Sequence, residues 1–157
     1  MAGKAQEVLA ALCSAMTEQR DLYVRLEGEA RALGEEAARP SEEADVDRIL
    51  ALVESKQTLM DELAALDARL VPLREAWAGV RLELPESERA PLAALIDELR
   101  ALMQLVMRIE EENSHRLTEH TEAIARRLGK VRRARRAGQA YGEQERGSRP
   151  RFYDERK

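Results

Sequence analysis

The stretch PLAALIDELRALMQLVMRIEEEN, residues 91–113, decides the fold of this chain. Its apolar residues recur at alternating steps of three and four, which places their side chains on one face of an α-helix. The row is Leu92, Leu95, Leu99, Leu102, Val106, Ile109 and Asn113. After a slip at Leu117 it continues through His120, Ile124, Leu128 and Val131, and Gly138 then supplies a stop signal. The pattern predicts one long helix over about residues 87–137.

Two further helices are expected before this one. The first covers about residues 4–37, where an apolar row with Gln19 as its one polar member precedes Gly34 and Pro40. The second covers about residues 41–80, with Ser41 or Asp45 as its N-cap. Its row is expected to include Val46, Ile49, Val53, Lys56, Met60, Leu63, Leu66, Leu70, Leu73, Trp77 and Val80.

A proline lies inside the second of these helices. Pro72 would clash with the carbonyl of Ala68, so a kink is expected there.

Composition favours narrow helical seams over a thick core. The chain of 157 residues is 36% charged and contains one Phe and one Trp, so Leu, Ala, Val, Ile and Met must supply its buried surface. The expected fold class is all-α: three long antiparallel helices form an elongated, coiled-coil-like bundle over residues 1–137.

Charge is divided unevenly along the chain. Residues 1–124 hold 14 Lys and Arg against 26 Asp and Glu, net −12, whereas residues 125–157 hold 12 against 4, net +8. The run RRLGKVRRARR, residues 126–136, admits three interpretations: a polyanion-binding segment, a helix end favoured by the helix dipole, or a surface for an acidic protein.

The third helix is expected to be longer than its neighbours, at about 70 Å or more. Its C-terminal part would then expose an apolar stripe without a partner in the chain. The stripe is Leu117, Ile124, Leu128 and Val131. Such a stripe favours a helix of another protein or self-association into a homo-oligomer.

Residues 138–157 are expected to form a disordered basic tail, because Gly142, Gly147 and Pro150 interrupt a segment without periodicity. Three of the five aromatic residues of the chain lie there. They are Tyr141, Phe152 and Tyr153, and they are typical of a docking peptide that orders on a partner.

The sequence contains no arrangement that indicates an enzyme. Glu112 and His115 have the Glu-x-x-His spacing of di-iron bundles, but this motif occurs once and the site needs two. Cys13 has no second cysteine to pair with. No catalytic residue, metal or cofactor is therefore expected. With no signal-peptide pattern and no membrane span, the protein is expected to be cytoplasmic.

Three segments resemble the FlgN-type flagellar export chaperones. LVESKQTLMDELAAL (residues 52–66) is similar to a helix of that family with a Lys-Gln-x-Leu-Leu stretch, although Met60 replaces the second Leu. EENSHRLTEHTEAIARRL (residues 111–128) is similar to the family's late helix, and the pair Tyr141-Gly142 also resembles family members.

This resemblance implies a chaperone that binds the C-terminal helices of hook–filament junction proteins of the FlgK/FlgL type. It would prevent their premature assembly and deliver them to the flagellar type III export gate. The cargo-binding residues would be Leu117, Ile124, Leu128 and Val131, flanked by Arg127 and Arg135, and Tyr141 would dock at the gate. The alternative is a coiled-coil scaffold that binds nucleic acid or another polyanion through the basic helix end, but nucleic acid is not the expected partner.

Overall fold

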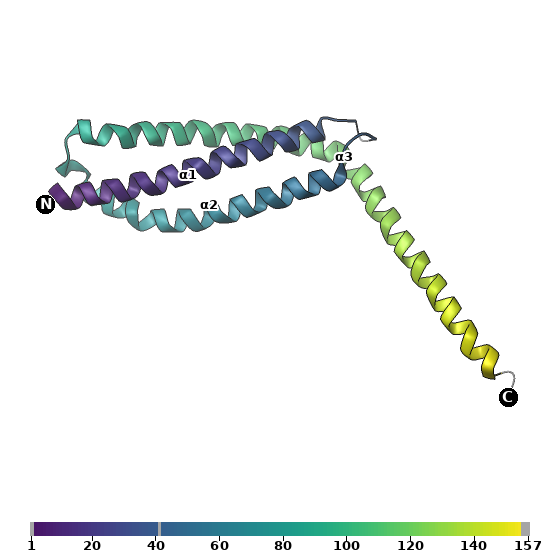
Figure 1. The fold of residues 1–157 in the computed structure, drawn as a ribbon. Helices are drawn as coiled ribbons and strands as arrows, with labels where there is room; N and C mark the ends of the chain where they lie inside the picture. Colours follow the sequence, from purple (N-terminus) through teal and green to yellow (C-terminus); the bar gives the residue numbers. More distant parts are fainter. Residues whose placement is uncertain (1, 41, 155–157) are drawn as a thin grey trace. The chain divides into compact units, whose positions relative to one another are not determined.

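A computed structural model of the protein describes residues 2–40 and 42–154, apart from the side chains of residues 2, 122–124, 128 and 143–154. The described part contains three α-helices and one short 3₁₀ helix: α1 (Ala2–Ala37), α2 (Val46–Val80), η1 (Arg81–Glu83) and α3 (Glu86–Asp154). The chain is divided into two compact units, Met1–Leu117 and Thr118–Lys157. In the first unit, α1, α2 and the first part of α3 lie side by side, and consecutive helices run in opposite directions (Figure 1). This confirms the predicted all-α, antiparallel three-helix fold.

The connection between α1 and α2 explains why α2 begins at Val46 rather than near residue 41. Asp45 is the N-cap, and its carboxylate accepts a hydrogen bond from the backbone N–H of Arg48 at 3.1 Å. The buried carboxylate of Glu36 accepts a second bond, from the backbone N–H of Asp45 at 2.7 Å. These two carboxylates fix the first turn of α2 to the end of α1.

The helix α3 continues beyond the end expected from the sequence. We expected a stop at Gly138 and disorder over residues 138–157, but α3 is helical through both Gly138 and Gly142 to Asp154. No glycine in the described residues has a positive φ, so none of these positions forms a left-handed helix cap. An isolated glycine weakens a helix by about 1 kcal/mol relative to alanine without ending it.

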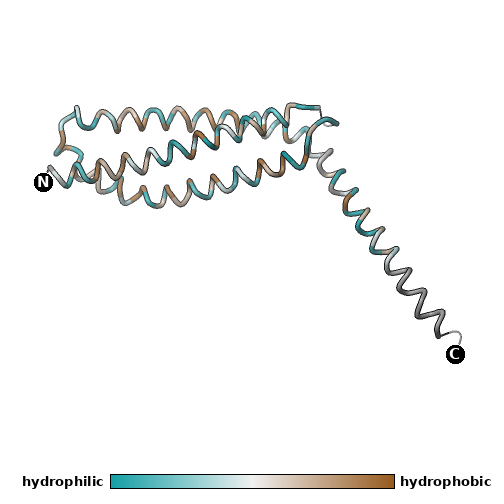
Figure 2. Tube along the Cα trace, in the orientation of Figure 1, coloured by the Kyte–Doolittle hydropathy of each residue, from teal (hydrophilic) through white to brown (hydrophobic). Residues whose placement is uncertain are grey.

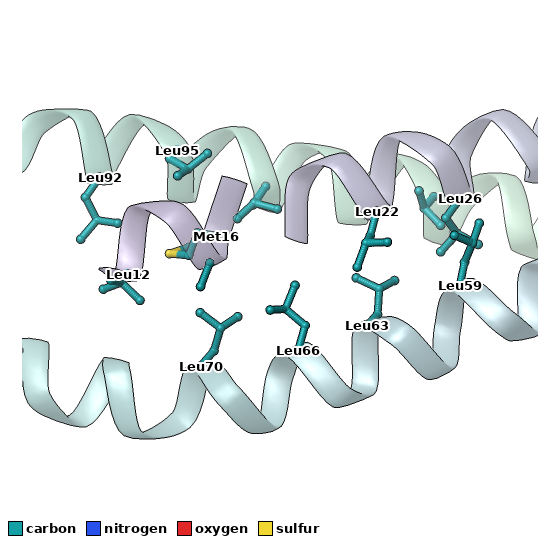
Figure 3. Close-up of a cluster of buried hydrophobic side chains, with 13 residues drawn as sticks. Leu12, Met16, Leu22, Leu26, Leu59, Leu63, Leu66, Leu70, Leu92 and Leu95 are labelled. Atoms are coloured by element: carbon teal, nitrogen blue, oxygen red, sulfur yellow. The ribbon is translucent and has the colours of Figure 1, made fainter. Parts of the chain in front are cut away.

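The core of the first unit is a long cluster of leucines that all three helices contribute (Figure 3). Hydrophobic residues alternate with hydrophilic ones along each of these helices, as a seam of heptad spacing requires (Figure 2). On α2 the buried residues are Val46, Ile49, Lys56, Leu59, Leu63, Leu66 and Leu70.

Two residues that we placed in the α2 seam are exposed instead. Val53 is 43% exposed and Met60 is 50% exposed, whereas Leu59 is 2% exposed. Leu59 and Met60 follow Lys56 by three and four residues, and both steps are compatible with a helical row. The continuation to Leu63 and Leu66 fits either residue, so the spacing alone could not select Leu59.

Three of the buried polar side chains of the first unit have a hydrogen-bond or ionic partner on another helix. Gln19 Nε2 donates to Asp67 Oδ1 at 2.9 Å, and Lys56 Nζ lies 2.7 Å from Glu110 Oε2. Asn113, only 1% exposed, donates through Nδ2 to the carbonyl oxygen of Ala30 at 2.8 Å. Each contact joins two helices, so each of these side chains keeps a polar partner on burial, although Asn113 Oδ1 itself accepts no hydrogen bond.

Gly34 allows α1 and α3 to approach closely beside Asn113. A Cβ atom at position 34 would lie 2.6 Å from Asn113 Oδ1 and 3.2 Å from Arg116 Nη1. Arg116 also donates to the carbonyl oxygen of Gly34 at 3.3 Å. The glycine that the sequence suggested as a helix end therefore lies inside α1 and serves helix packing.

Candidate functional site

A groove lies between α2 and α3 in the first unit. It consists of two adjoining cavities of about 900 and 600 Å³. Asp67, Gln104 and Met107 line both cavities, so the two form one continuous depression. Side chains of α1, including Tyr23 and Leu26, lie at its floor. We call it the α2–α3 groove.

Large apolar side chains of the α2–α3 groove are open to solvent. Met107 is 70% exposed, and Val71, Met60 and Met103 are 51%, 50% and 39% exposed. Methionine is flexible and polarisable, so it can adapt its shape to an incoming apolar surface. Four of the chain's five methionines, Met16, Met60, Met103 and Met107, line this groove, which makes it suited to binding another apolar element.

The two ends of the groove differ in charge. Exposed Arg74 and Arg100 lie at the end nearer to Ile96. At the other end Lys56 is held between α2 and α3 by Glu110, whose Oε1 lies 2.6 Å from the ammonium nitrogen. Arg100 Nη1 lies 3.9 Å from Asp97 Oδ1 in an exposed ion pair, so Arg74 is the arginine better placed to meet an acidic ligand group. The charge of Glu110 is already paired with Lys56.

The phenol of Tyr23 stays neutral in the groove floor. Burial, and secondarily the negative charge of Asp67, raise the pKa of Tyr23 above its usual value of 10.0. The groove floor therefore carries no tyrosinate at neutral pH.

The structure changes the interpretation of one predicted cargo-binding residue. Leu117 is half-buried and packs against the cluster of Leu33, Ala44 and Ile49. The expectation that Leu117 lacks a partner in the chain is wrong, because the bundle covers more of α3 than helix lengths suggested.

The remaining predicted residues lie in the second unit. Val131 is 47% exposed and Tyr141 is 73% exposed, and both Arg127 and Arg135 are exposed. The side chains of Ile124 and Leu128 lie outside the described residues.

Among the described residues, no group of three or more His, Cys, Asp or Glu side chains could hold a metal ion. Glu112 and His115 are not part of such a group there. Burial raises the pKa of the Cys13 thiol, which disfavours the reactive thiolate. In the same part of the chain, no helix is both long enough and apolar enough to cross a membrane.

Sequence reasoning missed the α2–α3 groove, although a signal for it exists. Met103 and Met107 lie four residues apart on α3, and Val71 lies four residues after Asp67 on α2. These positions form a second row beside the buried leucine row of each helix. A search for two apolar rows per helix would have found it.

Residues 8–148 match the family described as FlgN protein. No curated protein and no solved structure matches the chain.

Proposed function

This chain belongs to the FlgN family, a family of flagellar export chaperones, and from this premise we propose which clients it serves and how. Its clients are the C-terminal helices of hook–filament junction proteins of the FlgK/FlgL type. The protein binds them in the cytoplasm, prevents their premature assembly and delivers them to the export gate. No reaction is catalysed in this process, in keeping with a family of chaperones.

The observation that carries this proposal is an exposed apolar side chain on a helix whose surface is rich in charged residues. In the second unit, Val131 is 47% exposed on a segment of α3 that is rich in exposed arginine. An apolar side chain among exposed charges is available to a client helix, which would bury it on binding.

We place a client seat on α3 at Ile124, Leu128 and Val131. These residues follow one another at steps of four and three, and so share one face of the helix. Arg127 and Arg135 lie at helical spacing from the same face, where they can pair with acidic residues of the client. Leu117 is left out of this seat because it packs within the bundle.

The test is size-exclusion chromatography with light scattering. The full chain is mixed with purified C-terminal segments of the FlgK- and FlgL-type proteins of the same organism, at low and at high salt. We expect a one-to-one complex that survives high salt, because apolar burial is not screened by ions. Absence of a complex, together with salt-sensitive binding to an RNA or DNA control, would instead support a polyanion-binding scaffold.

We further propose that Tyr141 docks at the export gate, since its ring is 73% exposed and is available to a partner. Tyr141→Ala should leave the client complex intact but reduce secretion of the client several-fold, whereas Tyr141→Phe, which keeps the ring, should lose less. Secretion is measured by quantitative immunoblotting of culture supernatants. Normal secretion by Tyr141→Ala would remove this role.

A further inference from the structure

The walls of the α2–α3 groove repeat the spacing of a helix-packing seam. On α2 the lining residues Met60, Ala64, Asp67, Val71 and Arg74 follow at steps of four, three, four and three. On α3 the row is Ile96, Arg100, Met103, Met107 and Glu111. Such rows face a neighbouring helix in bundles of four helices. The first unit therefore has three helices, but α2 and α3 each present a second row of residues of the kind that faces a fourth helix in such bundles.

The groove has the length of a short helix. Its walls extend over about 15 residues of α2 and of α3, which corresponds to roughly 22 Å or four turns at 1.5 Å per residue. An occupant of this length would present apolar residues at two positions per heptad to Met60, Met103 and Met107. Because the groove is concave, it requires a convex element, and a helix meets that need.

A second copy of the chain fits this surface less well than a separate helix. In a symmetric dimer the same patch lies on both sides of the contact, so one groove would face another across an unfilled space. Arg74 is exposed at that end of the groove, and its positive charge also favours an occupant with an acidic residue there.

We propose that the α2–α3 groove binds one amphipathic helix of the export client, which completes a four-helix bundle. The client helix has apolar residues at heptad spacing over about four turns and an acidic residue beside Arg74. This inference rests on the proposed function. It adds a client seat on the first unit, separate from the seat at Ile124, Leu128 and Val131.

The test compares two double variants of the full chain. Met103→Glu with Met107→Glu places two charges in the groove, where a bound helix would bury them. Val24→Glu with Leu82→Glu is the matched control, because Val24 and Leu82 are 52% and 79% exposed and line neither cavity. Circular dichroism and thermal unfolding establish that both variants are folded.

Isothermal titration with the FlgK- and FlgL-type C-terminal segments gives the affinities. We expect the groove variant to bind at least about tenfold more weakly than wild type, and the control to bind normally. Unchanged affinity of the groove variant would overturn the inference while leaving the proposed function intact. If wild type binds neither segment, the proposed function falls, and this inference falls with it.

A second readout uses wild-type protein labelled at its methionine methyl groups. Addition of the client segment should shift the NMR signals of Met60, Met103 and Met107, which are assigned through single Met→Leu variants. Binding without these shifts would contradict the inference. A dimer of the protein alone that the groove variant abolishes would identify a second copy as the occupant and would also overturn it.

Discussion

Replacing Gly34 with alanine is expected to lower the free energy of unfolding by about 2 kcal/mol, although alanine is the better helix former. The new Cβ would lie 2.6 Å from Asn113 Oδ1. Asn113 cannot move away easily, because it is 1% exposed and is bonded to the carbonyl oxygen of Ala30. Either α1 and α3 separate or this hydrogen bond is lost, and each outcome costs more than the gain in helix propensity.

The matched control is Gly28→Ala in the same helix. No atom lies within 4 Å of a Cβ at position 28, so this change should stabilise the protein by about 1 kcal/mol. Urea unfolding followed by circular dichroism measures both values. Stabilisation by Gly34→Ala equal to that at Gly28 would show that α1 and α3 do not approach as closely as described.

The second large effect concerns the client seat on α3. Ile124→Asp together with Leu128→Asp should weaken client binding at least about 100-fold, because two apolar contacts are replaced by charges that binding would have to desolvate. Helix content should not change. Titration calorimetry with the FlgK- and FlgL-type segments measures the affinity, and circular dichroism the helix content.

The control for added charge is Ala125→Asp with Ala134→Asp. Both alanines are exposed on the same part of α3, so this variant gains the same two negative charges without losing a large apolar side chain. We expect at most a small loss of affinity. Wild-type affinity of the Ile124→Asp and Leu128→Asp variant would refute the seat.

Much of the fold could be predicted because apolar residues at heptad spacing lie on one face of a helix, and that face is the one that packs against other helices. The row from Leu92 to Asn113 fixed both the helical state and the buried face of α3, and Asp45 was one of two candidates for the N-cap of α2. The choice between Leu59 and Met60 could not be made, since neighbouring residues can both satisfy a helical step. That choice depends on where α1 and α3 lie, which is tertiary information.

The functional surfaces were predictable only in part. Val131 and Tyr141 are exposed and their roles stay predictions, whereas Leu117 packs inside the bundle because α1 and α2 reach further along α3 than expected. The α2–α3 groove was missed because only one apolar row was assigned to each helix. Residues outside that row were then taken to face solvent.

The three polar contacts in the core have a consequence for folding. A leucine seam repeats every seven residues, so a helix displaced along its neighbour by one heptad would still align leucine with leucine. In such a shifted register Gln19, Lys56 and Asn113 would be separated from Asp67, Glu110 and the carbonyl of Ala30. Each unsatisfied buried group would cost about 1–3 kcal/mol. We therefore expect these polar contacts to select one register of the three helices, although the leucine repeat alone would allow several.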